Sequence, residues 1–241
     1  MVFKQILNAC VDLIYPPVCL HCGLSLRVDQ HLLCTCCLDL LEFLDFKLHC
    51  PKCFSLGFCS KKHICAKCSS KKSSLTAIAA TFDYKGPSLT MIKNFKYGDK
   101  PYLSEGIAGF MAAQFVALKW PLPDIIVPVP ISFSHWFTRG YNQAELLSKN
   151  LSLILQCEVQ ELLHRKSDDY SQASLNHNQR MKLTGKSIQL KKNKNCQDKI
   201  ILLIDDVLTT GSTLQRCAES LLEGCPSSIY ALTACHAIAK N

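Results

Sequence analysis

Apolar and polar positions alternate in blocks along the chain after residue 74, and the blocks predict strands and helices in turn. Short apolar runs predict strands at Leu75 to Tyr84, Asp124 to Val129, Lys199 to Ile204 and Ser228 to Ala234. Longer stretches with apolar residues at helical spacing predict helices at Ser88 to Phe95, Tyr102 to Leu118, Gln143 to Leu155 and Ser212 to Leu222. Strands that alternate with helices are typical of a parallel sheet with helices on both faces, so we expect an α/β fold.

The first 74 residues follow a different pattern. Beyond the chain start, periodic apolar residues are scarce there, and eleven of the 16 cysteines lie at or before Cys68. We therefore expect two domains, a small Cys-rich one over residues 1–74 and an α/β one over residues 75–241. The chain start itself predicts an amphipathic helix that packs on a neighbouring domain rather than on a membrane, from the spacing of Phe3, Ile6, Leu7, Cys10, Leu13 and Ile14.

Eight of the cysteines form four CxxC pairs, and the third and fourth pairs repeat the first two at an offset of 31 residues. A CxxC turn presents two thiolates at the spacing that a tetrahedral zinc ion needs, so two pairs complete one structural site with no open position. Buried small side chains are the alternative, which the repeated spacing disfavours. Sequential and interleaved pairing both remain open, and Cys36, Cys59, His21, His49 and His63 are expected bystanders. The predicted ligands are Cys19, Cys22, Cys34, Cys37, Cys50, Cys53, Cys65 and Cys68.

The cellular location bears on this metal prediction. No stretch reaches the roughly 18 uninterrupted apolar residues of a membrane span, and the apolar start lacks a small-residue cleavage site. We expect a cytoplasmic chain, or one peripheral to the inner face of the membrane, where cysteines serve as metal ligands more often than as disulfides. The formal net charge of +8 counts every cysteine as neutral, and because metal ligation deprotonates thiols, the chain is only moderately basic.

The most informative segment reads ILLIDDVLTTGST from Ile201 to Thr213. A strand that ends at Ile204 would deliver Asp205 and Asp206 to its exposed end, where carboxylates can bind sugar hydroxyls or a magnesium shell. The hydroxyls and helix-start N–H groups of Thr209–Thr213 can then cradle a phosphate. A simple helix N-cap and solubilising carboxylates are the alternative for each feature alone. In this order the features favour a site for a phosphate together with a diol.

This segment resembles the 5-phosphoribosyl-1-pyrophosphate (PRPP) motif of type I phosphoribosyltransferases, and the Cys-rich front end is similar to that of the ComF family of competence proteins. Four further segments resemble ComF blocks in ComF order: Phe82-Asp83-Tyr84-Lys85-Gly86, Lys96-Tyr97-Gly98-Asp99, Val127-Pro128-Val129-Pro130 and Arg139-Gly140-Tyr141-Asn142-Gln143. The resemblance runs nearly end to end. It implies a type I phosphoribosyltransferase-like domain preceded by a double zinc ribbon.

The resemblance also implies roles for individual residues. Asp205 and Asp206 would hold the ribose hydroxyls of PRPP, and the Pro128–Ser132 turn would face a diphosphate bridged by magnesium. Arg139 would be an electrophilic partner in catalysis, with an ordinary loop arginine as the alternative. The implied catalytic residues are Asp205, Asp206 and Arg139, and the implied PRPP-binding residues are Asp205, Asp206, Val207, Leu208, Thr209, Thr210, Gly211, Ser212, Thr213, Pro130 and Ile131.

For the family, the resemblance implies a part in natural transformation, with single-stranded DNA and a competence helicase as partners. The segment 164–199 holds nine Lys or Arg against three Asp, which suits a phosphate backbone but also suits an ordinary solvated loop. The nucleic-acid candidates are Arg165, Lys166, Arg180, Lys182, Lys191, Lys192 and Lys194.

Three hypotheses remain open. The chain is a DNA-uptake accessory protein that binds PRPP, an active phosphoribosyltransferase with an unknown amine or base as acceptor, or a regulator in which PRPP alters DNA affinity. We favour the first, because the residues support the binding of PRPP better than its turnover.

Overall fold

The structure is a computed structural model that describes residues 17–27, 32–56, 64–70, 73–132, 137–138, 140–165, 187–192 and 194–237. Its α-helices are α2 (Thr35–Asp39), α3 (Ala66–Ser69), α4 (Gly86–Tyr97), α5 (Leu103–Leu118), α7 (Gln143–Leu155) and α9 (Ser212–Leu221). Short 3-10 helices lie at η1 (Phe46–Leu48) and η4 (Leu222–Gly224). Its strands are β1 (Ala77–Asp83), β2 (Ile125–Pro128), β3 (Glu158–Val159), β4 (Leu163–Arg165), β5 (Ile188–Leu190), β6 (Ile200–Leu208) and β7 (Ser228–His236).

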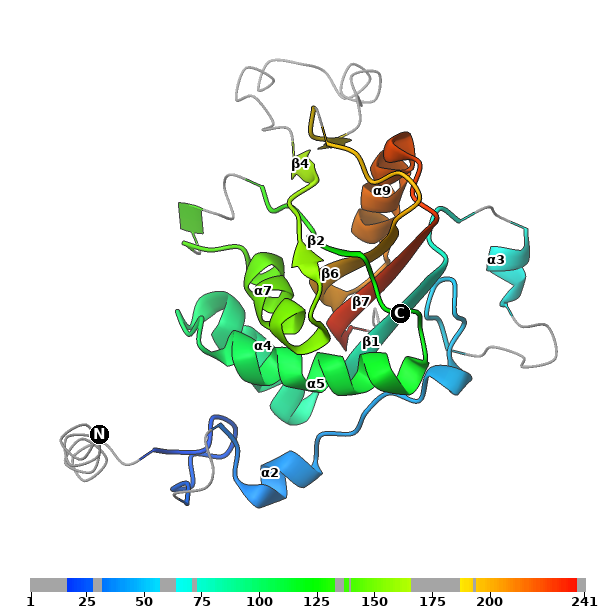
Figure 1. Cartoon of the computed structure of the whole chain (residues 1–241). Coiled ribbons are helices and arrows are strands. Elements are labelled where there is room, and N and C mark those ends of the chain that lie inside the picture. The colour runs from blue at the N-terminus through cyan, green and yellow to red at the C-terminus, as the bar shows by residue number, and fades with distance from the viewer. Residues whose placement is uncertain are drawn as a thin grey trace, which may run out of the picture.

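A parallel five-stranded sheet in the order β1-β7-β6-β2-β3 forms the centre of the molecule (Figure 1). Its central strands are buried on both faces, which explains why their sequences are nearly continuous apolar runs. From β2 the chain first runs outward to β3 and then returns to the other side of β2 as β6. Such a reversal opens a crevice at the carboxyl ends of the two strands, where α/β proteins bind ligands.

Helices cover both faces of the sheet, as the alternating pattern predicts. The α4, α5 and α7 helices pack on one face, and α9 packs on the other beside the antiparallel β4–β5 pair (Figure 1). A left-handed Lys119 ends α5 and a left-handed Gln156 ends α7, and Asn142 caps the start of α7 through its side chain. In the described ranges no helix combines the length and apolar character that a bilayer crossing requires.

The Cys-rich part lies along the outer edge of β1. The N–H of Leu44 donates to the carbonyl of Thr81 at 2.9 Å, and the N–H of Ile78 donates to the carbonyl of Pro51 at 2.7 Å. An edge strand exposes unpaired backbone groups, so these bonds complete β1. Buried residues of the Cys-rich part, among them Phe54, belong to the same apolar core as the sheet.

Several predicted boundaries need correction. The strand predicted at Lys199 to Ile204 continues to Leu208, because β7 pairs with it as far as Leu208–His236. The short strands β3, β4 and β5 were not predicted, since two or three residues are too few to show a period. The helix predicted at residues 3–14 lies outside the described residues.

Candidate functional site

The eight CxxC cysteines form two tetrads, and the pairing is sequential. The four Sγ atoms of Cys19, Cys22, Cys34 and Cys37 lie within 4.8 Å of one another, and the same holds for the second set. The second set consists of Cys50, Cys53, Cys65 and Cys68. The interleaved alternative is therefore excluded, and each tetrad could hold one metal ion.

The sulfur geometry fits a tetrahedral ion. The Sγ atoms of Cys22 and Cys34 lie 3.6 Å apart and those of Cys53 and Cys65 lie 3.7 Å apart, while sulfurs at zinc-ligand distance would be about 3.8 Å apart. Burial opposes ionisation of the Cys19 thiol, but hydrogen bonds from the backbone of Cys22, Cys34 and His21 together lower its pKa to about 6. The pKa of Cys65 is also lowered to about 6 by hydrogen bonds, against the effect of burial. By contrast, burial and the neighbouring thiols raise the pKa of Cys37 and of Cys68, so the four thiols of a tetrad do not ionise equally readily.

Of the cysteines and histidines that were not expected to bind metal, His21 and His49 have other contacts. The Nδ1 of His21 lies 2.9 Å from the Thr90 hydroxyl of α4, which joins the first tetrad region to the α/β domain. The His49 ring stacks on Phe54 with centroids 4.2 Å apart. Cys36 is exposed and lies outside the tetrads, while Cys59 and His63 lie outside the described residues.

The two acidic residues near the end of β6 point to opposite faces of the sheet, because side chains alternate along a strand. Asp205 lines a small pocket with the following loop. Burial raises the pKa of the Cys217 thiol of α9, and the Asp205 carboxylate raises it further, so Asp205 faces α9. Asp206 faces α4, where its Oδ1 lies 2.9 Å from the Nζ of Lys96. The prediction that the strand stops before both carboxylates is wrong, because β6 continues to Leu208. The predicted exposure fails for Asp206, which is only 8% exposed, whereas Asp205 is partly exposed.

The loop from Thr209 to Thr213 joins β6 to α9 and lines the same pocket as Asp205. Gly211 has a left-handed φ of +72°, a conformation that glycine adopts without strain. The Thr210 hydroxyl lies 3.0 Å from the Ser212 hydroxyl and accepts from the Ser212 N–H at 3.4 Å. Since Gly211 has no side-chain oxygen to cap α9, the helix start keeps N–H groups that can donate to an anion.

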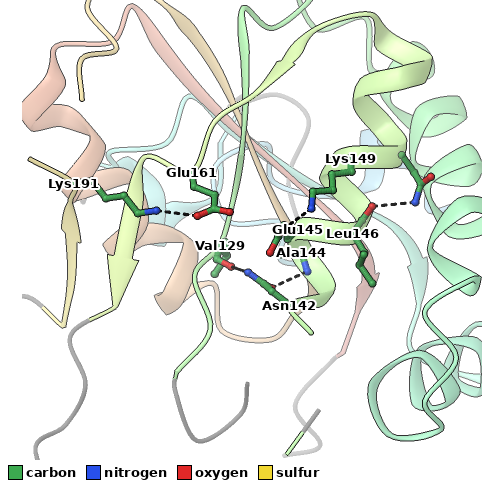
Figure 2. A network of polar contacts seen from close by, with 9 residues as sticks. Val129, Asn142, Ala144, Glu145, Leu146, Lys149, Glu161 and Lys191 are labelled. Carbon is green, nitrogen blue, oxygen red and sulfur yellow. Dashed lines mark hydrogen bonds and ion pairs between the residues drawn. The ribbon is translucent and has the colours of Figure 1, made fainter. Parts of the chain in front are cut away.

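The end of β2 lies beside the end of β6, so Pro130 and Ile131 come to the same edge as the carboxylates. Asn142 fixes the following segment: its Nδ2 donates to the Val129 carbonyl and its Oδ1 accepts from the Ala144 N–H, both at 3.1 Å (Figure 2). The Tyr141 hydroxyl donates to the carbonyl of Phe95 at the end of α4. Arg139, the predicted electrophile, lies outside the described residues.

A cavity lies where this segment meets the end of α4, and Lys96, Tyr97, Asp99, Thr138, Gly140 and Tyr141 line it. Two of the ComF-like blocks, about forty positions apart in the sequence, supply these walls. Lys96 therefore lies between Asp206 and an open cavity. Lys96 is part of the ComF-like block Lys96-Tyr97-Gly98-Asp99. Its burial and its pairing with Asp206 depend on tertiary packing, which no local sequence pattern reveals.

A broad groove separates the second tetrad from α9. The Cys-rich part contributes Lys52, Cys53, Cys68 and Ser73, and the α/β domain contributes Thr210, Gly211, Ser212, Gln215, Arg216 and Glu219. The Lys52 Nζ donates to the Leu75 carbonyl at 3.1 Å, and the Ser73 hydroxyl donates to Gln215 at 3.3 Å. The Thr209–Thr213 loop therefore borders this groove as well as the pocket that Asp205 lines.

The basic candidates are spread over two short elements. Arg165 is exposed at the end of β4, and Lys192 and Lys194 are exposed after β5. The Lys191 Nζ lies 2.9 Å from Glu161, which compensates part of its charge (Figure 2). The remaining candidates lie outside the described residues: Lys166, Arg180 and Lys182.

Residues 138–241 match the phosphoribosyl transferase domain family. Competence protein F of Haemophilus influenzae is 28% identical over 211 residues, covering 84% of this chain and 90% of the relative. Competence protein ComFC of Streptococcus pneumoniae is 27% identical, covering 85% and 93%. Along most of its length the chain is thus similar to competence proteins of the ComF type. DNA utilization protein YhgH of Escherichia coli K12 is 24% identical, covering 92% and 98%.

The chain has a phosphoribosyltransferase-type fold, shown by the domain match together with the parallel sheet and its helices. The relatives align along both the Cys-rich part and the α/β domain, since the chain covers at least 90% of each of them. The relatives therefore contain counterparts of both parts of this chain.

Proposed function

We propose that this protein binds PRPP in its α/β domain and aids the handling of single-stranded DNA in natural transformation. Zinc ions in the two tetrads hold the Cys-rich part in its fold, and magnesium accompanies PRPP. The observation that carries the proposal is the pocket of Asp205 and the Thr209–Thr213 loop, in a chain that aligns with competence proteins over most of its length.

The pocket supports PRPP binding because it offers the two kinds of group that a ribose phosphate needs. The Asp205 carboxylate can accept hydrogen bonds from ribose hydroxyls. The hydroxyls of the loop and the first N–H groups of α9 can donate to the 5-phosphate. The Pro130 and Ile131 backbone follows the end of β2, which pairs with β6, so it lies at the same edge of the sheet.

The exposed lysines after β5, Lys192 and Lys194, support the DNA part of the proposal, and so does the groove between the second tetrad and α9. Both halves of the chain line the groove, and its charged side chains are Lys52, Arg216 and Glu219. The relatives carry the words competence and DNA utilization in their names. Lysines that follow a phosphate backbone bind single strands with strong salt dependence.

An active phosphoribosyltransferase is the alternative function. The cavity beside Lys96 favours it, because a largely buried cation that lines a cavity suits a leaving group that carries negative charge. Release of pyrophosphate from PRPP with any amine or base in a broad panel would support this alternative. Tight binding of PRPP without pyrophosphate release would favour the accessory role.

Calorimetric titration with PRPP and magnesium tests the proposed binding of PRPP. We expect the wild type to bind and Asp205→Asn to bind about 10- to 100-fold more weakly, because a hydrogen bond to a charged group contributes roughly 1.5–3 kcal/mol. Asp198→Asn is the matched control, since Asp198 is exposed and precedes the opposite end of β6. Equal affinity in all three proteins, or no binding by the wild type, would refute PRPP binding at this site.

Measurements of oligonucleotide binding at several salt concentrations test the proposed binding of single-stranded DNA. Reversing the charges of Lys191, Lys192 and Lys194 to Glu should weaken single-strand binding at least tenfold at low salt and flatten its salt dependence. Reversing Lys47, Lys93 and Lys119, which are exposed elsewhere, changes the net charge equally and should have a smaller effect. If both triple variants bind alike, the attraction is general and not located after β5. A wild type that binds no single strands even at low salt would overturn this part.

A further inference from the structure

One side of helix α5 has almost none of the polar side chains that an exposed helix surface normally carries. The helix has 16 residues, of which only Glu105 is charged. Its other exposed positions, the outer face of α5, are all apolar: Gly109, Ala113, Val116 and Ala117. On α9, by contrast, the exposed positions are polar: Ser212, Arg216 and Glu219. A helix that is apolar all round is normally covered all round, so the outer face of α5 indicates a binding partner.

The outer face of α5 is open within the part of the chain that the structure describes. Apart from the adjoining backbone, no atom lies within 4 Å of the point where Gly109 would carry a Cβ. The Val116 side chain is 70% exposed. Because burial of apolar surface is the main favourable term in association, this face can bind another apolar surface.

Apolar side chains continue on both sides of the outer face. On one side, the centroid of the Phe43 ring lies 6.2 Å from that of the Phe110 ring of α5, and Phe43 is 46% exposed. On the other side, the Nδ2 of Asn150 in α7 donates to the Ser104 hydroxyl of α5 at 2.9 Å. Ile154 lies one turn after Asn150 on the same side of α7 and is 51% exposed. The outer face is thus the middle of a wider apolar surface, which marks an interaction site.

The chain itself contains a segment that suits this surface, at residues 3–14, outside the described residues. Its apolar residues recur at helical spacing: Phe3, Ile6, Leu7, Cys10, Leu13 and Ile14. The opposite side of such a helix would carry Lys4, Gln5, Asn8 and Asp12. As a helix the segment would be about 17 Å long, the same as α5 from Gly106 to Ala117.

The first tetrad region brings the end of this segment close to α5. The Leu20 N–H donates to the Leu32 carbonyl at 2.9 Å. The Cδ1 of Leu32 lies only 2.8 Å from the point where Gly106 would carry a Cβ, so Leu32 lies directly on the first half of α5. Ile14 is six residues before Leu20, and six residues span at most about 20 Å. The segment can therefore reach the outer face, with Ile14 at the Gly106 end.

We propose that residues 3–14 form a helix that lies antiparallel on the outer face of α5 and covers it with its apolar side. A second copy of the chain is the weaker candidate, because a segment tethered beside the face binds at a high effective concentration. The contact fastens the Cys-rich part to the α/β domain at a second place besides the edge of β1. It depends neither on PRPP nor on DNA, so it goes beyond the proposed function.

Hydrogen–deuterium exchange of the full-length protein tests the contact from the side of the segment. Leu7→Glu places a charge on the apolar side and should make the amides of residues 3–14 exchange about tenfold or more faster, because the helix leaves the surface. Asn8→Glu is the matched control, since it places the same side chain one position along, on the polar side. Exchange in this variant should stay as slow as in the wild type.

The same measurement tests the contact from the side of α5. Ala113→Glu places a charge in the middle of the outer face and should speed the exchange of residues 3–14 as much as Leu7→Glu does. Lys93→Glu, at an exposed position of α4, should not. Exchange in the central strands β6 and β7 reports whether each variant is folded.

A disulfide cross-link tests the direction of the helix. In the antiparallel arrangement Cys10 lies four positions from Ile14, at the level of Gly109. Mild oxidation of Gly109→Cys should therefore link the introduced thiol to Cys10, as peptide mapping detects. Cys225 is the control within the same protein, because it is exposed after α9 on the opposite side of the sheet and should not link to Cys10.

Several outcomes would overturn the inference. Fast exchange of residues 3–14 in the wild type, or equal effects of Leu7→Glu and Asn8→Glu, would show that the segment is not docked. If light scattering shows a wild-type dimer that Ala113→Glu converts to a monomer, with the exchange of residues 3–14 unchanged, a second copy covers the face instead. Slow exchange of the segment only in the presence of anionic lipid vesicles would assign it to a membrane surface.

Discussion

A protein with Cys37 replaced by serine is expected to carry one metal ion instead of two and to lose the fold around the first tetrad. The four sulfurs of this tetrad lie within 4.8 Å of one another, and a serine hydroxyl is a poor replacement for a thiolate. Structural zinc contributes roughly 10–16 kcal/mol of apparent binding free energy in small domains, which a short region with few periodic apolar residues cannot supply otherwise. Elemental analysis of the purified protein measures the ion count, and limited proteolysis reports the fold.

Cys36→Ser is the matched control, because Cys36 is the neighbouring residue in the same helix α2 but is exposed and outside the tetrad. This variant should keep both ions and unfold at the wild-type temperature. Two results would contradict the assignment: a wild type without bound metal, or an ion lost from Cys36→Ser as readily as from Cys37→Ser.

The two cysteine tetrads were predictable from the sequence as candidate metal sites, because the CxxC turns depend on local spacing. The pairing of the four CxxC turns was not, since it depends on how the chain returns to itself. The α/β fold was also predictable, because periodic apolar residues over ten or more positions determine which face of a helix is buried. The α7 helix, for example, has the predicted bounds of Gln143 and Leu155.

The candidate site was predictable only in part. The Thr209–Thr213 loop and Asp205 are close in sequence, so their order alone indicated a binding site for a phosphate and a diol. The end of β6 was misjudged because Asp205 and Asp206 are polar residues inside a strand, and pairing with β7 overrides that local signal. Lys96 lies more than a hundred positions before Asp206, and only tertiary packing brings the two together.

Phe54→Ala is expected to lower the free energy of unfolding by about 3–5 kcal/mol, the usual cost of removing a buried phenyl ring from a core. Phe54 is 1% exposed, its ring stacks on His49 at 4.2 Å, and it lies edge-on to His236 of β7 at 5.5 Å. It therefore joins the second tetrad region to the sheet. Denaturant unfolding followed by far-ultraviolet circular dichroism measures the change, with Leu56→Ala as control.

Leu56 is a suitable control because it lies two positions along the same segment but is 55% exposed, so its loss should change stability by no more than about 0.5 kcal/mol. Equal effects of the two substitutions would mean that the packing against β7 contributes little.

The contact of Phe54 also reaches the ligand site. His236 is the register partner of Leu208, and the N–H of Ala237 donates to the Leu208 carbonyl at 2.8 Å, directly before the Thr209–Thr213 loop. Loss of the Phe54 ring should therefore weaken PRPP binding as well as stability, whereas Leu56→Ala should leave it unchanged. A destabilised Phe54→Ala protein that still binds PRPP with wild-type affinity at low temperature would show that the Cys-rich part does not support the loop through β7.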